Sequence, residues 1–303
     1  ILSKVLWDKD SDIDNIKSEF LNNYYGEAGE LVGQYIDLIH EHARASWRRM
    51  DIYDNPIMPH QNYLSPKLIT DYLNILDTAE SLVKGNTELA KRVQMASMPL
   101  HFAVLQQARF FGIDQNGIFI RQGKNWVVRD EIRKKLSFFL SSVKDLQITQ
   151  LNESGLTPEQ YQAEWEHIFE AGPVIHKAIN KPVSLLTINN PEFVSKGART
   201  LVDGIGGSED FQYNWLGWNE TDMKVEIDME AQTLISKIEL SFLENHRHYM
   251  FLPKAIYIEL SDDGKNYKEV DRMTIEGPFE DVSEPIRKFN FDLNNQRARY
   301  IKV

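Results

Sequence analysis

The sequence predicts two domains, an N-terminal α-helical domain over residues 1–178 and a C-terminal β-sandwich over residues 179–303. Apolar residues recur at helical spacing through most of the first part, whereas apolar and polar residues alternate in the last third. Between them, Gly172-Pro173 ends the helical pattern. A chain of 303 residues is long enough for two domains that each bury a core.

The helical part consists of amphipathic stripes, each with a recognisable start. A polar cluster before Ile13 can cap a first helix, and a long stripe that begins at Ala28 predicts a second. Ser65 followed by Pro66 is typical of an N-cap with proline at the first helical position, and Thr87 caps the helix that follows. These starts predict a series of consecutive helices.

The pattern changes in the later part of this domain. Pro99 lies inside the stripe that Thr87 begins and predicts a kink or a break. Residues 118–128 are typical of a small hairpin. Asp130 then caps a further helix, and Thr157 begins the last one with a capping box.

The C-terminal part shows the period-two alternation of strands that bury one face. This alternation occurs in Met223–Met229, Ile238–Phe242, Ile256–Leu260 and Phe289–Leu293. Val183–Ile188 is a candidate first strand, and Asp263-Gly264 suits a hairpin turn between two of the rows. Short strands separated by turns favour a sandwich.

The composition argues against several kinds of partner and site. The formal net charge is −11 and no cluster of Lys and Arg is present, so we expect no nucleic-acid partner. The absence of cysteine removes disulfides, thiolate metal sites and cysteine nucleophiles. No apolar run reaches the roughly 18 residues of a membrane span. The chain begins with Ile1 and shows no leader, so we expect a fragment or a mature product.

A set of motifs in the C-terminal part occurs in a characteristic order. The motifs are Asp203-Gly204 within Ala198–Ser208, the aromatic run Asn214-Trp215-Leu216-Gly217-Trp218, Phe251-Leu252-Pro253 and the turn Ser261–Asn266. This order resembles the discoidin-like (coagulation factor 5/8 type C) domains and, within them, the family 32 carbohydrate-binding modules. The resemblance implies a galactose-binding-like jelly-roll sandwich that binds a glycan. Because the chain stops at Val303, we expect the domain to be truncated before its last strand.

Three aromatic-rich motifs near the start of the chain also resemble a known family. Leu6-Trp7-Asp8, Glu19-Phe20-Leu21 and Tyr24–Ala28 are similar to the C-terminal helical part of an uncharacterised family of large secreted bacterial proteins related to glycoside hydrolases. The resemblance implies a preceding (β/α)₈ barrel and a secreted, periplasmic or cell-surface location in a bacterium. We expect a monomer.

Loop residues with aromatic, histidine and arginine side chains are the candidates for a sugar site. Sugar rings present C–H faces that stack on aromatic rings, and their hydroxyls pair with directional donors. The candidates are Tyr213, Trp218, His246, Arg247, His248 and Tyr249. Alternatively the aromatics belong to the core, as we expect for Trp215, or residues 246–249 form a solvated loop. A two-histidine metal site is a third possibility, for which no further ligand stands at a suitable spacing.

The resemblance also implies a structural Ca²⁺ ion beside Asp203. Ser208 and Asp210 could supply further oxygens, since Ca²⁺ takes roughly six to eight oxygen ligands. A plain Asp-Gly turn is the alternative.

Two pairs of carboxylates have the side chains that a glycosidase needs, Glu27 with Glu30 and Glu164 with Glu166. Each pair lies on a helix with a regular apolar stripe, which predicts a solvated face and no catalytic residue. We therefore expect the non-catalytic C-terminal portion of a secreted polysaccharide-processing protein. The alternatives are a part of a glycoside hydrolase whose helical domain completes an active site, and an adhesion module that binds protein or lipid.

Overall fold

The computed structural model describes residues 2–49, 54–153, 155–193, 195–276 and 284–303. The chain divides into two compact units, Ile1–Gly172 and Pro173–Val303. The division lies before the expected boundary at residue 178, because the segment that follows Gly172 already bonds to the second unit. Val174 donates its backbone N–H to the carbonyl of Gly204, and Asn180 donates to that of Val202, each at 2.8 Å.

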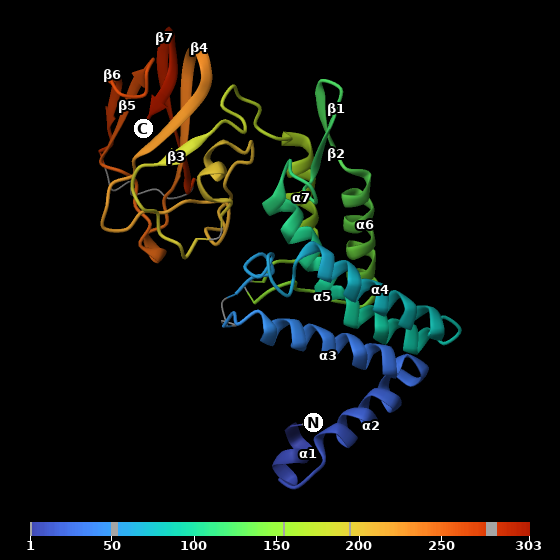
Figure 1. Ribbon diagram of the computed structural model, residues 1–303. Coiled ribbons are helices and arrows are strands. Elements are labelled where there is room, and N and C mark those ends of the chain that lie inside the picture. The colour runs from blue at the N-terminus through green and yellow to red at the C-terminus, as the bar shows by residue number, and fades with distance from the viewer. Residues whose placement is uncertain (1, 50–53, 154, 194, 277–283) are drawn as a thin grey trace. The chain divides into compact units, whose positions relative to one another are not determined.

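The first unit is helical, as predicted (Figure 1). Its helices are α1 (Leu2–Trp7), α2 (Ile13–Tyr25), the 3₁₀ turn η1 (Gly26–Ala28), α3 (Gly29–Ala45), α4 (Pro66–Val83), α5 (Thr87–Phe111), α6 (Asp130–Asp145) and α7 (Pro158–Ala171).

Side chains cap the N-termini of α2, α4, α5 and α7. Ser65 caps α4, and Thr157 caps α7 with the predicted capping box. Two predicted caps are wrong by one residue. Asn86 rather than Thr87 caps α5, since its side-chain oxygen accepts from two backbone N–H groups of the first turn. Asp130 lies inside the first turn of α6, where its carboxylate still complements the helix dipole.

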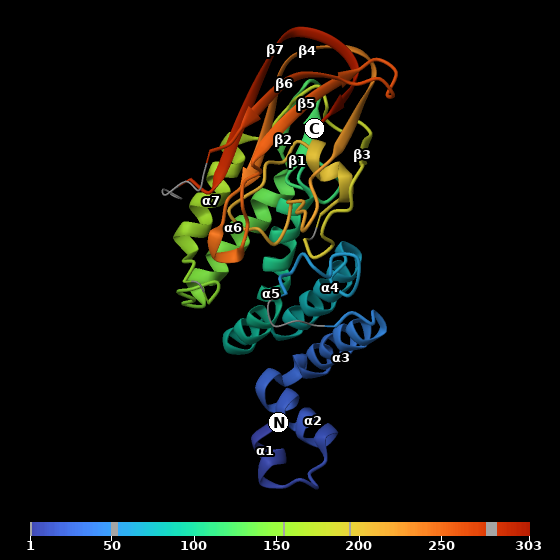
Figure 2. The same ribbon diagram turned by 90° about the vertical axis from the view of Figure 1, so that its left-hand side faces the viewer.

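Helix α5 continues through Pro99, so the predicted break does not occur. The helix bends near its middle in the view of Figure 2, as expected for a residue that lacks a backbone N–H and crowds the preceding turn. Val93 and Leu100 are buried on either side of Pro99. Their burial supports the helix where a hydrogen bond is lost.

The core of the first unit lies among α2, α3, α4 and α5. Tyr72 is fully buried there, and its hydroxyl donates to the carbonyl of Tyr63 at 3.0 Å and contacts Nδ1 of His42 at 2.7 Å. Gly29 allows α3 to begin close to α2, because a Cβ atom at this position would lie 2.6 Å from the carbonyl oxygen of Leu21. Strands β1 (Phe119–Gln122) and β2 (Asn125–Val128) form the predicted hairpin.

The second unit contains a five-stranded antiparallel sheet with the order β3-β4-β7-β5-β6. The strands are β3 (Val183–Leu185), β4 (Val225–Leu243), β5 (Ala255–Ser261), β6 (Lys268–Thr274) and β7 (Ile286–Lys302). Two rows that the sequence predicts as separate strands, Met223–Met229 and Ile238–Phe242, fall in the single strand β4, except that Met223 and Lys224 precede it. Register shifts against β7 between them let one strand carry both rows.

The core of this unit lies on one face of the sheet, where Ile258, Phe291 and Leu293 are almost completely buried. The predicted turn joins β5 to β6 through Asp263 and Gly264. Backbone N–H groups of Asn266 and Lys265 donate to the carboxylate of Asp263, which holds the pKa of that carboxyl well below its usual range.

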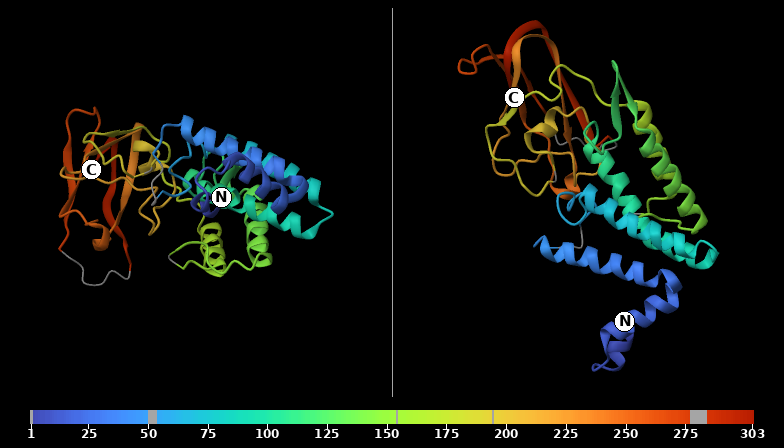
Figure 3. Two further views of the ribbon diagram at one scale, coloured as in Figure 1. Left: turned by 90° about the horizontal axis from the view of Figure 1, so that it is seen from below. Right: turned by 45° about the vertical axis from the view of Figure 1, so that its right-hand side comes forward.

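Irregular segments of the chain lie at one end of the sheet, where β4 ends and β5 begins. The 3₁₀ turn η3 (His246–His248) lies at this end in Figures 1 and 3, beside loops from the chain between β3 and β4. Loops at the end of a rigid sheet are common places for binding sites. Within the described parts of the chain, no helix is both long and apolar enough to cross a membrane.

Candidate functional site

The candidate site is built on the turn segment, which we define as residues 244–251. The turn segment begins where β4 ends. An isolated antiparallel β-bridge closes this segment, because Asn245 and Met250 exchange two backbone hydrogen bonds of 3.0 Å. Glu244 at its base is only 2% exposed. One oxygen of its carboxylate lies 2.9 Å from Nε2 of His246, and the other accepts from Nε of Arg287 at 3.4 Å. A buried carboxylate therefore holds both an imidazole and a guanidinium.

Two aromatic residues of the turn segment face solvent. Tyr249 is 85% exposed and Phe251 is 65% exposed. The ring of Phe251 lies 5.3 Å from that of His246, with 33° between their planes. Tyr249 has a left-handed backbone, with φ of 57°, so the chain reverses direction between His246 and Phe251. The turn segment thus displays apolar ring faces beside a fixed imidazole.

A second segment adjoins the turn segment, the aromatic segment of residues 207–218. The ring of Phe211 lies 4.4 Å from that of His248, whose Nδ1 is 3.0 Å from the side-chain oxygen of Asn245. The turn segment and the aromatic segment therefore meet at Phe211 and His248. Arg247 is exposed between the two histidines.

The aromatic rings predicted in the second segment are less accessible than a sugar platform requires. Tyr213 is 3% exposed, so its ring offers no free face, and the expectation that it stacks on a sugar is not met in this structure. Trp218 is half-buried, and its Nε1 has no hydrogen-bond partner in the described parts of the chain. Trp215 supports the loop, as expected, because its Nε1 donates to the carbonyl of Ser208 at 2.9 Å and its ring packs on Gly207.

Sequence reasoning missed four contributors to this site, Phe211, Glu244, Phe251 and Arg287. Arg287 comes close to Glu244 through the pairing of β4 with β7, in which Phe242 is the register partner of Arg287. No local pattern predicts that pairing. Phe251 could have been predicted from the sequence, because an aromatic residue that closely follows histidine and arginine in a loop is typical of a binding site.

Comparisons with known proteins identify the domain that carries the site. The F5/8 type C domain profile matches residues 187–303. This segment is an F5/8 type C domain. A comparison with curated proteins finds no match.

Several solved structures are similar to this F5/8 type C domain. A fucose binding module of Streptococcus pneumoniae has 17% identity, covers 43% of this chain and 83% of its own, and has a TM-score of 0.31. The lectin domain of lectinolysin complexed with Lewis B antigen has 17% identity, coverages of 43% and 84%, and a TM-score of 0.29. CpGH89CBM32-5 from Clostridium perfringens, in complex with GalNAc-β-1,3-galactose, has 14% identity, coverages of 41% and 81%, and a TM-score of 0.27.

The oxygens proposed for Ca²⁺ in the F5/8 type C domain already have partners. Asp203 is 1% exposed, and its carboxylate forms an ion pair with the ammonium group of Lys196 and accepts from the backbone N–H of Ile205. The carboxylate of Asp210 accepts from the backbone N–H of Gln212. The hydroxyl of Ser208 contacts the backbone carbonyl of Asp210, at 3.5 Å, and not its carboxylate. No group of three His, Cys, Asp or Glu residues in the described part of the chain could hold a metal. This donor set does not fit Ca²⁺.

The carboxylate pairs of the helical unit lie at its surface. Glu27, Glu30, Glu164 and Glu166 are all exposed, and Glu164 forms an ion pair with Arg109 at 3.2 Å. The prediction that these side chains belong to solvated faces is confirmed.

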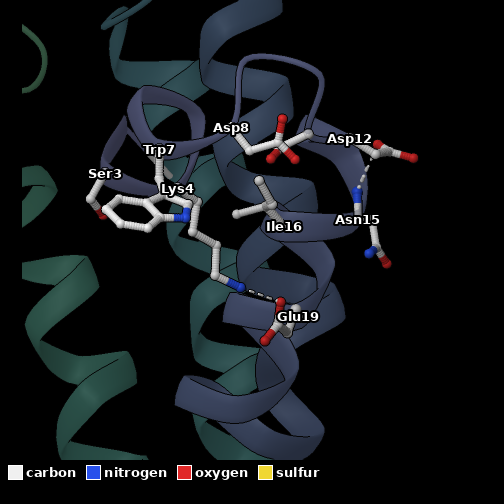
Figure 4. Close-up of a pocket in the computed structure, with 9 residues that line it drawn as sticks. Ser3, Lys4, Trp7, Asp8, Asp12, Asn15, Ile16 and Glu19 are labelled. Carbon is white, nitrogen blue, oxygen red and sulfur yellow. Dashed lines mark hydrogen bonds and ion pairs between the residues drawn. The ribbon is translucent and has the colours of Figure 1, made fainter.

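A hollow of about 610 Å³ lies between α1 and α2. Figure 4 shows Trp7 at its side and the side chains of Lys4 and Glu19 pointing toward one another. The ammonium group of Lys4 donates to the Glu19 carboxylate at 2.6 Å. Asp12 in the same hollow caps α2. Helix α1 buries none of its residues, so the hollow lacks the rigid walls that position a ligand. The F5/8 type C domain remains the better candidate.

Proposed function

We propose that the F5/8 type C domain binds a glycan at the turn segment. The observation that carries this proposal is that the turn segment holds two exposed aromatic residues, Tyr249 and Phe251, together with His246, which packs against Phe251 and contacts a buried carboxylate. A pyranose ring can lay its C–H face on either aromatic ring. His246 and Arg247 then lie within the same turn to pair with its hydroxyls.

The expected affinity is modest. An open site that captures one or two sugar units buries little area and leaves many hydroxyls hydrated, so we expect a dissociation constant of about 0.1 to 1 mM.

We infer further that the chain is a non-catalytic part of a protein that processes or adheres to polysaccharides. Because many structural polysaccharides lie outside the cell membrane, this function suits a secreted, periplasmic or cell-surface protein.

Calorimetry with the full chain tests the glycan site. The first ligands are fucose, the Lewis B antigen and GalNAc-β-1,3-galactose, which are the sugars named for the three compared proteins. For a bound ligand, Tyr249→Ala and Phe251→Ala should each weaken binding by about 3-fold to 30-fold, since each removes a stacking face.

Tyr257→Ala is the matched control, because Tyr257 is a half-exposed aromatic residue on β5 outside the turn segment. It should bind as the wild-type protein does. If the control weakens binding while Tyr249→Ala and Phe251→Ala do not, the glycan binds elsewhere on the sheet. If no ligand of a wider glycan panel binds at up to about 10 mM, the proposed function is wrong.

A further inference from the structure

The feature that carries a further inference is the contact between Glu244 and His246, and the inference rests on the proposed glycan site. We propose that Glu244 is a positioning residue that keeps the ring proton of His246 on Nε2. Nδ1 is then a hydrogen-bond acceptor toward the ligand. The site would therefore select glycans with a free hydroxyl that donates a proton at the recognised position, and reject those substituted there.

The assignment of the proton follows from the partners of Glu244. Its carboxylate is bonded to the guanidinium of Arg287 through one oxygen and approaches His246 Nε2 through the other at 2.9 Å. An ionised carboxylate only accepts hydrogen bonds, so the proton between Glu244 and His246 belongs to Nε2. A neutral imidazole carries one N–H group, which leaves the lone pair on Nδ1.

The ring is held in this orientation from several sides. Phe251 packs against it, and the backbone bridge between Asn245 and Met250 fixes the turn from which it projects. Rotation of the ring would remove the hydrogen bond from a carboxylate that is 2% exposed, leaving a buried charge with one partner fewer. The side chain of His246 is 36% exposed, and Nδ1 forms no hydrogen bond among the described residues.

An acceptor at this place restricts what can bind. A sugar hydroxyl can donate to Nδ1, whereas a fluorine, an ether or a sulfate ester at the same carbon offers no proton. A site that pairs a polar group with a substrate hydroxyl discriminates strongly against an analogue that lacks it, because its own group is left unpaired. The ligand class is therefore a glycan that is unsubstituted at the hydroxyl facing His246.

The tautomer can be measured in the ligand-free full chain, which separates this inference from the proposed function. At about pH 8, where histidines are ordinarily neutral, two-bond ¹⁵N–¹H correlation spectra should show His246 with a protonated Nε2 and an unprotonated Nδ1. In Glu244→Gln, the carboxamide oxygen can stay with Arg287 while its NH₂ group donates to Nε2. The His246 proton should then move to Nδ1.

A wild-type spectrum with the proton on Nδ1, or the same tautomer in both proteins, overturns the inference. Glu244→Gln must keep the wild-type circular dichroism. His248, which contacts Asn245 rather than Glu244, is the internal control and should keep its tautomer in the variant.

A ligand series tests the selectivity with methyl β-D-galactopyranoside and its deoxyfluoro analogues. For the wild-type chain, one deoxyfluoro analogue should bind at least about tenfold more weakly than the parent, and Glu244→Gln should reduce that ratio. If every analogue binds as the parent does, the acceptor role of His246 is wrong. If the galactoside itself does not bind, that ligand is excluded, and the tautomer measurement decides the inference.

Discussion

At the scale of single residues, Lys196 and Asp203 form an ion pair at the place where the sequence predicts a metal ion. Their ion pair is almost completely buried, with side-chain exposures of 9% and 1%. Replacing Lys196 by methionine would leave the carboxylate buried without its counter-charge. We expect Lys196→Met to lower the free energy of unfolding by about 3 to 5 kcal/mol, measured by chemical denaturation.

A double variant supplies the control. Lys196→Met combined with Asp203→Asn removes both charges and keeps an oxygen for the N–H of Ile205, so it should recover part of the lost stability. Since the ammonium group already balances the carboxylate, a chelator should leave the melting temperature of the wild-type protein unchanged. A fall in melting temperature with chelator, reversed by Ca²⁺, would contradict this account.

His101 in α5 makes the helical unit sensitive to acid. Burial lowers the pKa of His101 to about 4, with a smaller contribution from Lys135, and its buried Nδ1 has no hydrogen-bond partner among the described residues. A histidine with a lowered folded-state pKa binds protons more readily when unfolded. Its contribution to stability is complete above about pH 6.5 and is lost as the pH falls toward 4.

We expect the wild-type chain to lose roughly 2 kcal/mol across this window through His101, allowing for solvent screening of a partly exposed group. His101→Gln, which does not titrate, should lack this part of the pH dependence. The measurement is urea denaturation of both proteins at several pH values. Parallel stability curves for the two proteins would show that His101 does not titrate as described.

At the scale of elements, the aromatic segment depends on a close approach of its backbone to a ring. A Cβ atom at Gly207 would lie 2.2 Å from Cε2 of Trp215, whereas a Cβ atom at Gly206 would meet no atom within 4 Å. Gly207→Ala should therefore destabilise the domain by about 1 to 3 kcal/mol and displace the segment that carries Phe211. Gly206→Ala is the matched control and should be close to wild type. Thermal unfolding of the two variants tests the difference, and equal stabilities would contradict the packing described.

The strands were predictable because they bury one face, which leaves a period of two in the sequence. Their lengths were not predictable from this pattern. Irregular register between Asp228 and Thr233 interrupts the alternation within β4 and gave the appearance of two strands. Whether a chain turns or bulges at such a point depends on the partner strand, here β7, which lies far away in the sequence.

The candidate site was predictable only where its residues are consecutive. His246, Arg247, His248 and Tyr249 stood out as one polar and aromatic run between strands. Glu244 follows the predicted strand Ile238–Phe242 and Arg287 precedes the predicted strand Phe289–Leu293, and only the tertiary pairing joins them. Tyr213 shows the opposite error, since the sequence reveals an aromatic residue in a loop but not its burial.

At the scale of the whole molecule, the two units have separate cores. We expect the purified chain to hydrolyse no glycoside, because the carboxylate pairs Glu27 with Glu30 and Glu164 with Glu166 are exposed on helices. The measurement is release of chromophore from aryl-glycosides and of reducing ends from polysaccharides. Turnover that Glu27→Gln or Glu164→Gln abolishes would contradict this expectation.

The long pairing of β4 with β7 also bears on how the protein folds. The helices of the first unit contact their neighbours in sequence, α3 with α4 and α4 with α5, whereas β4 must find a strand beyond both β5 and β6. Closing such a loop costs chain entropy before any contact compensates it, so distant pairing slows folding. Glu244 and Arg287 meet at the end of this pairing, so we expect the turn segment to acquire its shape only after β4 and β7 have paired.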